Sequence, residues 1–345
     1  MVCYSTFSHE IKTKNIDTYL KLFDSVVKPI FLYSSEIWGK CNKIESNIEN
    51  FGNSSWERFH SRICKTVIGA HKRVSSLASL SDIGRYPISI EINNRMIRYF
   101  LRFKTMDENR LAYKAFLDQL SEGRQRSNWV NKVKGTLDRN GFSYVFTKVA
   151  DFKNTDELEE TKLLSNKIKK REQCIFEQKI LCYLEDKKRK NEGKLTFYAS
   201  IKEKFGREKY LQIKNIKSRN RIRDIRISSH KLHIETGRYQ NVPRELRVCN
   251  YCSEGKIETE EHFTLECSNY KSERSAFFGS IKGTINNPRG DRSILKQLFL
   301  SEDLEVLNKF GMFLHNCWEK RTIKKVLDDI VNSVVKNLTD SVIPV

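Results

Sequence analysis

The stretch CNYCSEGKIETEEHFTLEC, residues 249 to 267, constrains the fold of its surroundings more than any other part of the sequence. Cys249 and Cys252 have C-x2-C spacing, which lets two thiolates approach one ion from a tight turn. His262 and Cys267 follow with H-x4-C spacing, which is also found in zinc modules. These four residues predict a tetrahedral Cys3His zinc site.

Four protein ligands leave no open position for water, so the predicted zinc has a structural role rather than a catalytic one. Gly255 can relax the turn after the two cysteines, and Thr259 with the two acidic residues after it predicts a helix start. His262 would then lie in the first helical turn and Cys267 near its end. The alternative is a set of reduced thiols that only pack.

An enzymatic reading rests on His233 and Glu235, an H-x-E pair upstream of C-x2-C that is superficially similar to zinc-dependent deaminases. That signature expects a proline directly before the first cysteine, where this chain has Val248. It also gives no role to His262 and Cys267. We therefore keep it only as an alternative, and expect His230 and His233 to pack or form hydrogen bonds.

The charge balance favours a polyanionic partner. The chain of 345 residues has 63 Lys and Arg against 43 Asp and Glu, a formal net charge of +20. The N-terminus lacks an apolar signal core, and charges interrupt every apolar stretch before it reaches membrane-spanning length. We expect RNA or DNA as partner, with no membrane and no small-molecule substrate.

The cysteines indicate a reducing compartment. There are nine, an odd number without a paired framework. This predicts an intracellular protein, nuclear or cytoplasmic. The positions are 3, 41, 64, 174, 182, 249, 252, 267 and 317.

The most basic part of the chain directly precedes the cysteine cluster. Residues 201–240 contain twelve Lys and Arg against four acids. Arg219, Arg223 and Arg226 stand at i, i+4 and i+7, so on a helix they would form one row of guanidinium groups suited to phosphate contacts. The alternative is a solvated basic face.

Few prolines and glycines and a helical spacing of apolar residues predict a mainly α protein. Helices are expected from an N-cap at Asp17, from about Ser54, after Pro87, from about Asp156 to Lys190, and as two or three closing helices. Asp328 and Asp329 should lie on a solvated helix face. The expected regions are 1–120 (a helical domain), 121–195 (a connecting helical segment), 196–285 (the basic segment with the zinc module) and 286–345 (C-terminal helices).

Three blocks resemble the region downstream of the polymerase core in the reverse transcriptases of LINE-type, non-LTR retrotransposons. LKLFDSVVKPIFLYSSEIWG (20–39) is similar to the opening of the family's thumb region, which more often has Gly where Ser34 stands. FHSRICKTVIGAHKRVSSLASLSDIGRYPISIEI (59–92) resembles the helical continuation. IRISSHKLHIETGRYQNVPRELRVCNYCSEGKIETEEHFTLECSNY (225–270) looks like the C-terminal zinc module, which commonly has Pro at the position of Ser268.

The resemblance implies a thumb-like helical domain in residues 1–120 and contact with template RNA or target DNA during target-primed reverse transcription. It assigns these contacts to basic residues of the thumb-like helices and to basic residues beside the zinc. The first set is Arg58, Lys65, Lys72 and Arg73; the second is Lys217, Arg219, Arg221, Arg223, Arg226, Lys231 and Arg238.

The family's polymerase activity depends on a Tyr-x-Asp-Asp turn, which this sequence lacks, and we recognise no endonuclease domain. We therefore expect a C-terminal fragment of such a reverse transcriptase, either a decayed copy or a reading frame that begins late, which by itself is not an enzyme. The remaining alternative is an interaction module or a non-functional pseudogene product.

Overall fold

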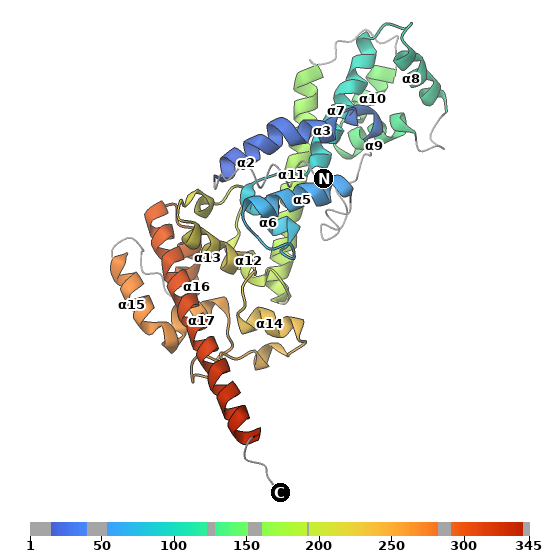
Figure 1. Ribbon diagram of the computed structural model, residues 1–345. Coiled ribbons are helices and arrows are strands. Elements are labelled where there is room, and N and C mark those ends of the chain that lie inside the picture. The colour runs from blue at the N-terminus through green and yellow to red at the C-terminus, as the bar shows by residue number, and fades with distance from the viewer. Residues whose placement is uncertain are drawn as a thin grey trace. The chain divides into compact units, whose positions relative to one another are not determined.

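The computed structural model describes residues 15–39, 54–122, 128–150, 161–191, 193–281 and 291–340 (Figure 1). These residues are mainly helical, which confirms the predicted fold class. Within them Val248 and Ile257 form an isolated antiparallel bridge, and no longer strand is present. The predicted helix start at Asp156, together with Cys3 and Cys41, lies outside the described residues.

The chain divides into two compact units, and the boundaries fall at the end of α5 and inside α6 and α11. The first unit takes residues 1–67 and 79–183, and the second takes 68–78 and 184–345. The segment predicted to connect two domains therefore belongs largely to the first unit. The zinc-module region and the C-terminal helices, predicted as separate regions, belong to the second.

The first unit contains the helices from α2 to α11, of which α6 and α11 are shared with the second unit. Their bounds are α2 Ile16–Leu22, η1 Phe23–Val27, α3 Lys28–Leu32, α4 Ser35–Trp38, α5 Ser55–Val67, α6 Ser76–Ile83 (shared), α7 Ile88–Leu101, η3 Arg102–Thr105, α8 Leu111–Ser121, α9 Trp129–Arg139, α10 Ser143–Ala150 and α11 Thr161–Lys190 (shared).

Local chemistry sets the first helix differently from the prediction. The N-cap is Asn15 rather than Asp17, because the Asn15 side chain accepts hydrogen bonds from the backbone N–H groups of Asp17 and Thr18. Pro29 has no N–H to donate, and the turn Phe23–Val27 just before it widens into a π-helix. The predicted boundary near Pro29 is thus a local rewinding of a continuous helix.

Aromatic side chains fill much of the core of the first unit. Phe103 stacks on Phe116 with ring centroids 4.4 Å apart, and Phe100 stacks on Phe146 at 5.4 Å. Glu172 of α11 is also buried. The side-chain amide of Asn93, which is distant in sequence, donates a hydrogen bond to its carboxylate at 2.9 Å. This unit therefore combines a hydrophobic core with buried acids, among them Glu57, Asp82 and Glu172.

The second unit contains the cysteine cluster and the longest helix. Its helices are α12 Thr196–Ile201, η4 Lys209–Gln212, α13 Ile216–Arg226, α14 His233–Tyr239, η5 Arg244–Leu246, η6 His262–Glu266, η7 Ser268–Tyr270, α15 Lys271–Ser280, α16 Asp291–Phe299 and α17 Leu304–Asp340. Helix α17 joins two of the predicted closing helices into one, and Asp328 and Asp329 are exposed on it, as predicted.

Helix α13 packs along α17, and a glycine permits their close approach. A Cβ at Gly311 of α17 would lie 2.6 Å from both the Cβ and the carbonyl oxygen of Ser218 on α13. The side chains of Ile222 and Ile225 are fully buried beside this contact. The α13–α17 pair thereby fixes the basic segment against the rest of the second unit.

Among the described residues, no helix combines the length and apolar character that a bilayer crossing requires.

Candidate metal centre

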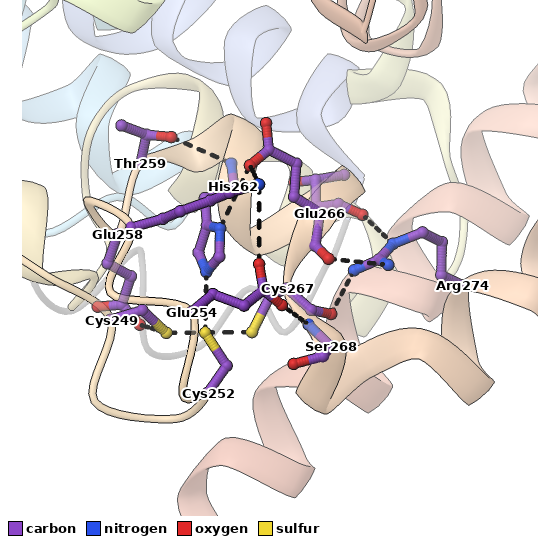
Figure 2. A network of polar contacts seen from close by, with 12 residues as sticks. Cys249, Cys252, Glu254, Glu258, Thr259, His262, Glu266, Cys267, Ser268 and Arg274 are labelled. Carbon is purple, nitrogen blue, oxygen red and sulfur yellow. Dashed lines mark hydrogen bonds and ion pairs between the residues drawn. The ribbon is translucent and has the colours of Figure 1, made fainter.

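The structure brings the four predicted ligands together. The sulfur atoms of Cys249, Cys252 and Cys267 and a ring nitrogen of His262 all lie within 4.8 Å of one another (Figure 2). Cys249, Cys267 and His262 are buried, and Cys252 is half-buried. Three thiols and an imidazole therefore converge on one point. His262 stands ten positions after Cys252 in the sequence.

The distances fit a tetrahedral ion. With Zn–S bonds of about 2.3 Å and Zn–N bonds of about 2.05 Å, a tetrahedron has S···S edges of about 3.8 Å and S···N edges of about 3.6 Å. The sulfur atoms of Cys249 and Cys267 are 4.0 Å apart, and the Cys252 sulfur is 3.4 Å from His262 Nε2. The site needs little rearrangement to accept a metal with this geometry.

The first two ligands, Cys249 and Cys252, lie in a tight turn between Val248 and Ile257, which form the antiparallel bridge. The backbone N–H of Cys249 donates to the Lys256 carbonyl at 2.8 Å, and Gly255 has a φ of +66°, which favours glycine. The Tyr251 N–H points at the Cys249 sulfur at 3.4 Å. A thiolate at this position therefore receives a backbone hydrogen bond in addition to any metal.

The other two ligands lie on a short helical turn. The Thr259 hydroxyl accepts the His262 N–H at 3.0 Å, which bears out the predicted helix start. The turn His262–Glu266 is a π-helix, and the Cys267 N–H closes it on the His262 carbonyl at 2.8 Å. This wider turn brings residues five apart in sequence onto one side, so the H-x4-C pair can face one ion.

Charged residues hold the ligands from outside. His262 presents Nε2 to the sulfurs, while its Nδ1 lies 3.4 Å from the Glu266 carboxylate, which also pairs with Lys256 at 3.1 Å. A carboxylate on the second ring nitrogen fixes the tautomer and the orientation of a metal-binding histidine. Figure 2 shows this contact beside the four ligands.

Arg274 of α15 fastens the end of the ligand segment. Its guanidinium donates to the carbonyl oxygens of Thr264, Glu266 and Cys267 at 3.1, 3.3 and 2.6 Å (Figure 2). These carbonyls lie at the end of a helical turn, and that of Cys267 also accepts the Tyr270 N–H at 3.2 Å. Arg274 therefore anchors Cys267 to the helix that follows it.

The thiols influence one another without an ion. The hydrogen bond with Cys267 and burial together raise the pKa of Cys249 to about 12, whereas the same hydrogen bond lowers the pKa of Cys267. Burial lowers the pKa of His262, but its contacts with Cys249 and Glu266 outweigh burial and raise it. Metal binding here requires deprotonated ligands and so releases protons.

A groove of about 960 Å³ opens beside the metal ligands within the second unit. Tyr251, between the first two cysteines, and Trp318 of α17 form part of its wall. The Arg321 guanidinium lies 3.9 Å from the Tyr251 ring centroid, and that of Arg221 lies 5.2 Å from the Trp318 centroid. Lys231 and Lys325 line the groove together with Asp224, Glu258, Asp328 and Asp329.

Glu258 ties this groove to the metal centre. It is buried, its carboxylate lies 3.7 Å from the Cys249 sulfur, and Arg321 forms a bidentate pair with it, one bond measuring 3.0 Å. A carboxylate beside a thiolate is electrostatically unfavourable unless a cation offsets it. Arg321 supplies that cation from α17.

The structure separates the predicted nucleic-acid contacts into three groups by exposure. Arg58, Lys72, Arg73, Lys217 and Lys231 are exposed, and Lys65, Arg219, Arg221 and Arg238 are half-buried. Arg58 and Lys65 belong to the first unit and all the others to the second. Lys72 and Arg73, predicted on a thumb-like helix, follow α5 in a turn.

The predicted row of three guanidinium groups is wrong for Arg223 and Arg226, which are buried. The Arg226 side chain has 0% exposure, pairs with Glu208 at 2.7 Å and lies over the rings of Tyr198 and Tyr210. Arg223 donates to the Ile68 carbonyl at 2.7 Å and pairs with Asp224. Helix α13 buries this face because its isoleucines and both arginines point into the unit.

His230 and His233 make hydrogen bonds to protein atoms, as expected from the sequence. His233 Nδ1 lies 2.9 Å from the Val248 carbonyl oxygen, and His230 Nε2 lies 3.1 Å from the Glu260 carboxylate. Glu235, the proposed deaminase acid, pairs with Arg238 at 2.9 Å. Among the described residues, the close ligand group contains His262 and not His233.

Four residues of the candidate site are not predicted from the sequence: Glu266, Arg274, Trp318 and Arg321. Only Glu266 carries a local signal, because it stands four residues after His262 and a helical turn places it beside the ring. Arg321 reaches Glu258 across 63 residues, and no spacing rule covers such a pair.

Comparison with known proteins found no matching family model, no matching curated protein and no matching solved structure.

Proposed function

We propose that the chain binds RNA or DNA through the groove beside the metal centre, and that the metal is a structural zinc ion. The groove carries the proposal. It combines the rings of Tyr251 and Trp318 with four basic side chains, beside four acidic ones, next to the turn that holds the first two cysteines, in a chain with a net charge of +20. Cations with interleaved aromatic rings suit a nucleic-acid backbone and its bases.

The three sequence blocks and the converging Cys3His group support a placement in the region that follows the polymerase core of LINE-type reverse transcriptases. In that setting the groove would contact template RNA or target DNA. Three sulfurs with one nitrogen favour zinc, since soft thiolate ligands select it over hard cations such as magnesium. All four positions of a tetrahedron are filled by protein, so the zinc would hold the fold.

Salt dependence tests the binding. Fluorescence anisotropy with labelled RNA and DNA oligonucleotides should give affinities that fall on the order of tenfold or more between 50 and 200 mM salt, because phosphate contacts release counterions. Lys231→Glu should weaken binding more than Lys114→Glu, a matched change at an exposed lysine of the first unit. No binding, or affinity independent of salt, would contradict the proposal.

Native mass spectrometry tests the metal. The purified protein should carry one zinc, and Cys267→Ser should lose it, whereas Cys182→Ser, an exposed cysteine outside the ligand group, should keep it. A wild-type protein that is purified without metal and is as stable as it is after zinc is added would contradict the zinc assignment.

A further inference from the structure

The C-terminal half of α17 carries an exposed apolar stripe. Ile323, Val326, Leu327, Ile330 and Val331 are 60%, 51%, 56%, 54% and 58% exposed. They stand at i, i+3, i+4, i+7 and i+8, the spacing of one continuous helix face. Within the second unit, the end of α17 runs beyond its neighbouring helices (Figure 1).

This stripe is not the outer end of the face that α17 buries. The N-terminal half of α17 buries Val306, Phe310, Phe313 and Cys317. At 100° per residue, the centre of the exposed stripe points roughly a quarter to a third of a turn away from that face, and the two meet at Val331, which stands five full turns after Phe313. Most of the stripe therefore faces away from the core of the second unit. Five large apolar side chains on one exposed helix face form an apolar patch of the kind that marks an interaction site.

The stripe lies in a self-complementary sequence. Residues 323–330 read IKKVLDDI. The reversed sequence is IDDLVKKI. When the two are aligned, each isoleucine is opposite an isoleucine, valine is opposite leucine, and each lysine is opposite an aspartate. Two copies laid antiparallel, with a two-fold axis between Val326 and Leu327, set Ile323 level with Ile330 of the second copy. The same pairing sets Lys324 and Lys325 level with the two aspartates of the second copy, although Lys325 and Asp329 lie on the groove side of the helix and not beside the stripe.

One lysine is positioned for this pairing. In an antiparallel helix pair, the same flank of each helix meets its counterpart. Lys324 and Asp328 stand one turn apart on one flank of the stripe, so each faces the opposite charge of the other copy. Lys324 donates to the Tyr251 carbonyl at 3.0 Å, which holds it on that flank.

We propose that this stripe is a homodimerisation surface, on which two copies of the chain pair through antiparallel α17 helices. The contact spans nine residues of each helix, about 13 Å. Such a contact is smaller than a standard protein interface, so the dimer is weak and forms with rising protein concentration.

Sedimentation equilibrium of the full chain over a concentration series tests the dimer. The wild-type protein should shift from monomer to dimer, and Leu327→Glu with Ile330→Glu should weaken association at least tenfold. Leu163→Glu, the same change at an apolar residue of α11 that is also exposed, should leave association unchanged. A wild-type protein that stays monomeric at all concentrations would overturn the proposal, as would equal association of all three proteins.

Cysteine cross-linking tests the orientation. In a background with Ser at positions 3, 41, 174 and 182, Ile323→Cys and Ile330→Cys proteins should form a disulfide when mixed, and neither should cross-link to itself. Circular dichroism of each variant shows whether it keeps its helices. Self-cross-linking at both positions without the mixed product would show a parallel pair and refute the antiparallel arrangement.

Discussion

The carboxylate of Glu266 holds the ring nitrogen of His262 that does not face the sulfurs. Glu266→Gln should therefore weaken metal affinity by about 10- to 100-fold without removing a ligand. Competition with a chromophoric zinc chelator measures this affinity. Glu245→Gln, at an exposed residue, is the matched control and should change nothing. Equal affinity of both variants would show that Glu266 does not orient the ring.

A second residue, Glu172, should make stability depend on pH. Burial raises the pKa of Glu172 to about 7, although hydrogen bonds from Asn93 and Asn140 partly oppose the rise. Between about pH 4.5 and 7 the folded state binds the proton that the unfolded state has lost, so the contribution of Glu172 to stability falls as pH rises.

The variant Glu172→Gln removes that titration. Its free energy of unfolding, compared with wild type, should increase from pH 5 to pH 8 by up to about 3 kcal/mol. Urea unfolding at several pH values, followed by circular dichroism, measures the difference. Because other groups titrate equally in both proteins, a difference that stays constant with pH would rule out a raised pKa at Glu172.

At the scale of elements, the crossing of α13 and α17 depends on Gly311. A methyl group there would meet Ser218 at 2.6 Å, so Gly311→Ala must separate the helices and should cost about 1–3 kcal/mol of unfolding free energy. Gly279→Ala in α15 meets no atom within 4 Å and should be neutral or stabilise by up to about 1 kcal/mol. Denaturant unfolding compares the two; a stable Gly311→Ala protein would mean that the helices do not approach so closely.

Elements whose positions depend on neighbouring residues could be predicted from the sequence, and contacts between distant elements could not. Helical spacing placed α5 and α7 within a residue or two, and short-range ligand spacing placed the metal group, because both depend on neighbours in sequence. The burial of Arg226 depends on Glu208, Tyr198 and Tyr210, and spacing on one helix does not reveal which face other elements cover. Long-range partners such as Arg321 and Glu258 were missed for that reason.

At the scale of the whole molecule, the division into two units predicts that metal loss acts on one of them. All four ligands belong to the second unit. Removing the metal with a chelator should increase amide hydrogen exchange in residues 193–281, and leave residues 88–122 of the first unit nearly unchanged. Hydrogen exchange with mass spectrometry locates the change. Equal loss of protection in both ranges would mean that the chain unfolds as a single cooperative unit.

The four ligands span only residues 249–267, whereas Arg321 joins Glu258 from 63 residues further along the chain. Closing so short a loop costs little entropy, and contacts that are local in sequence form quickly. During synthesis an ion could therefore bind this group once Cys267 has emerged, before α17 is made. The metal-bound turn would then act as an early folding nucleus onto which α17 docks last, through its guanidinium contact with Glu258.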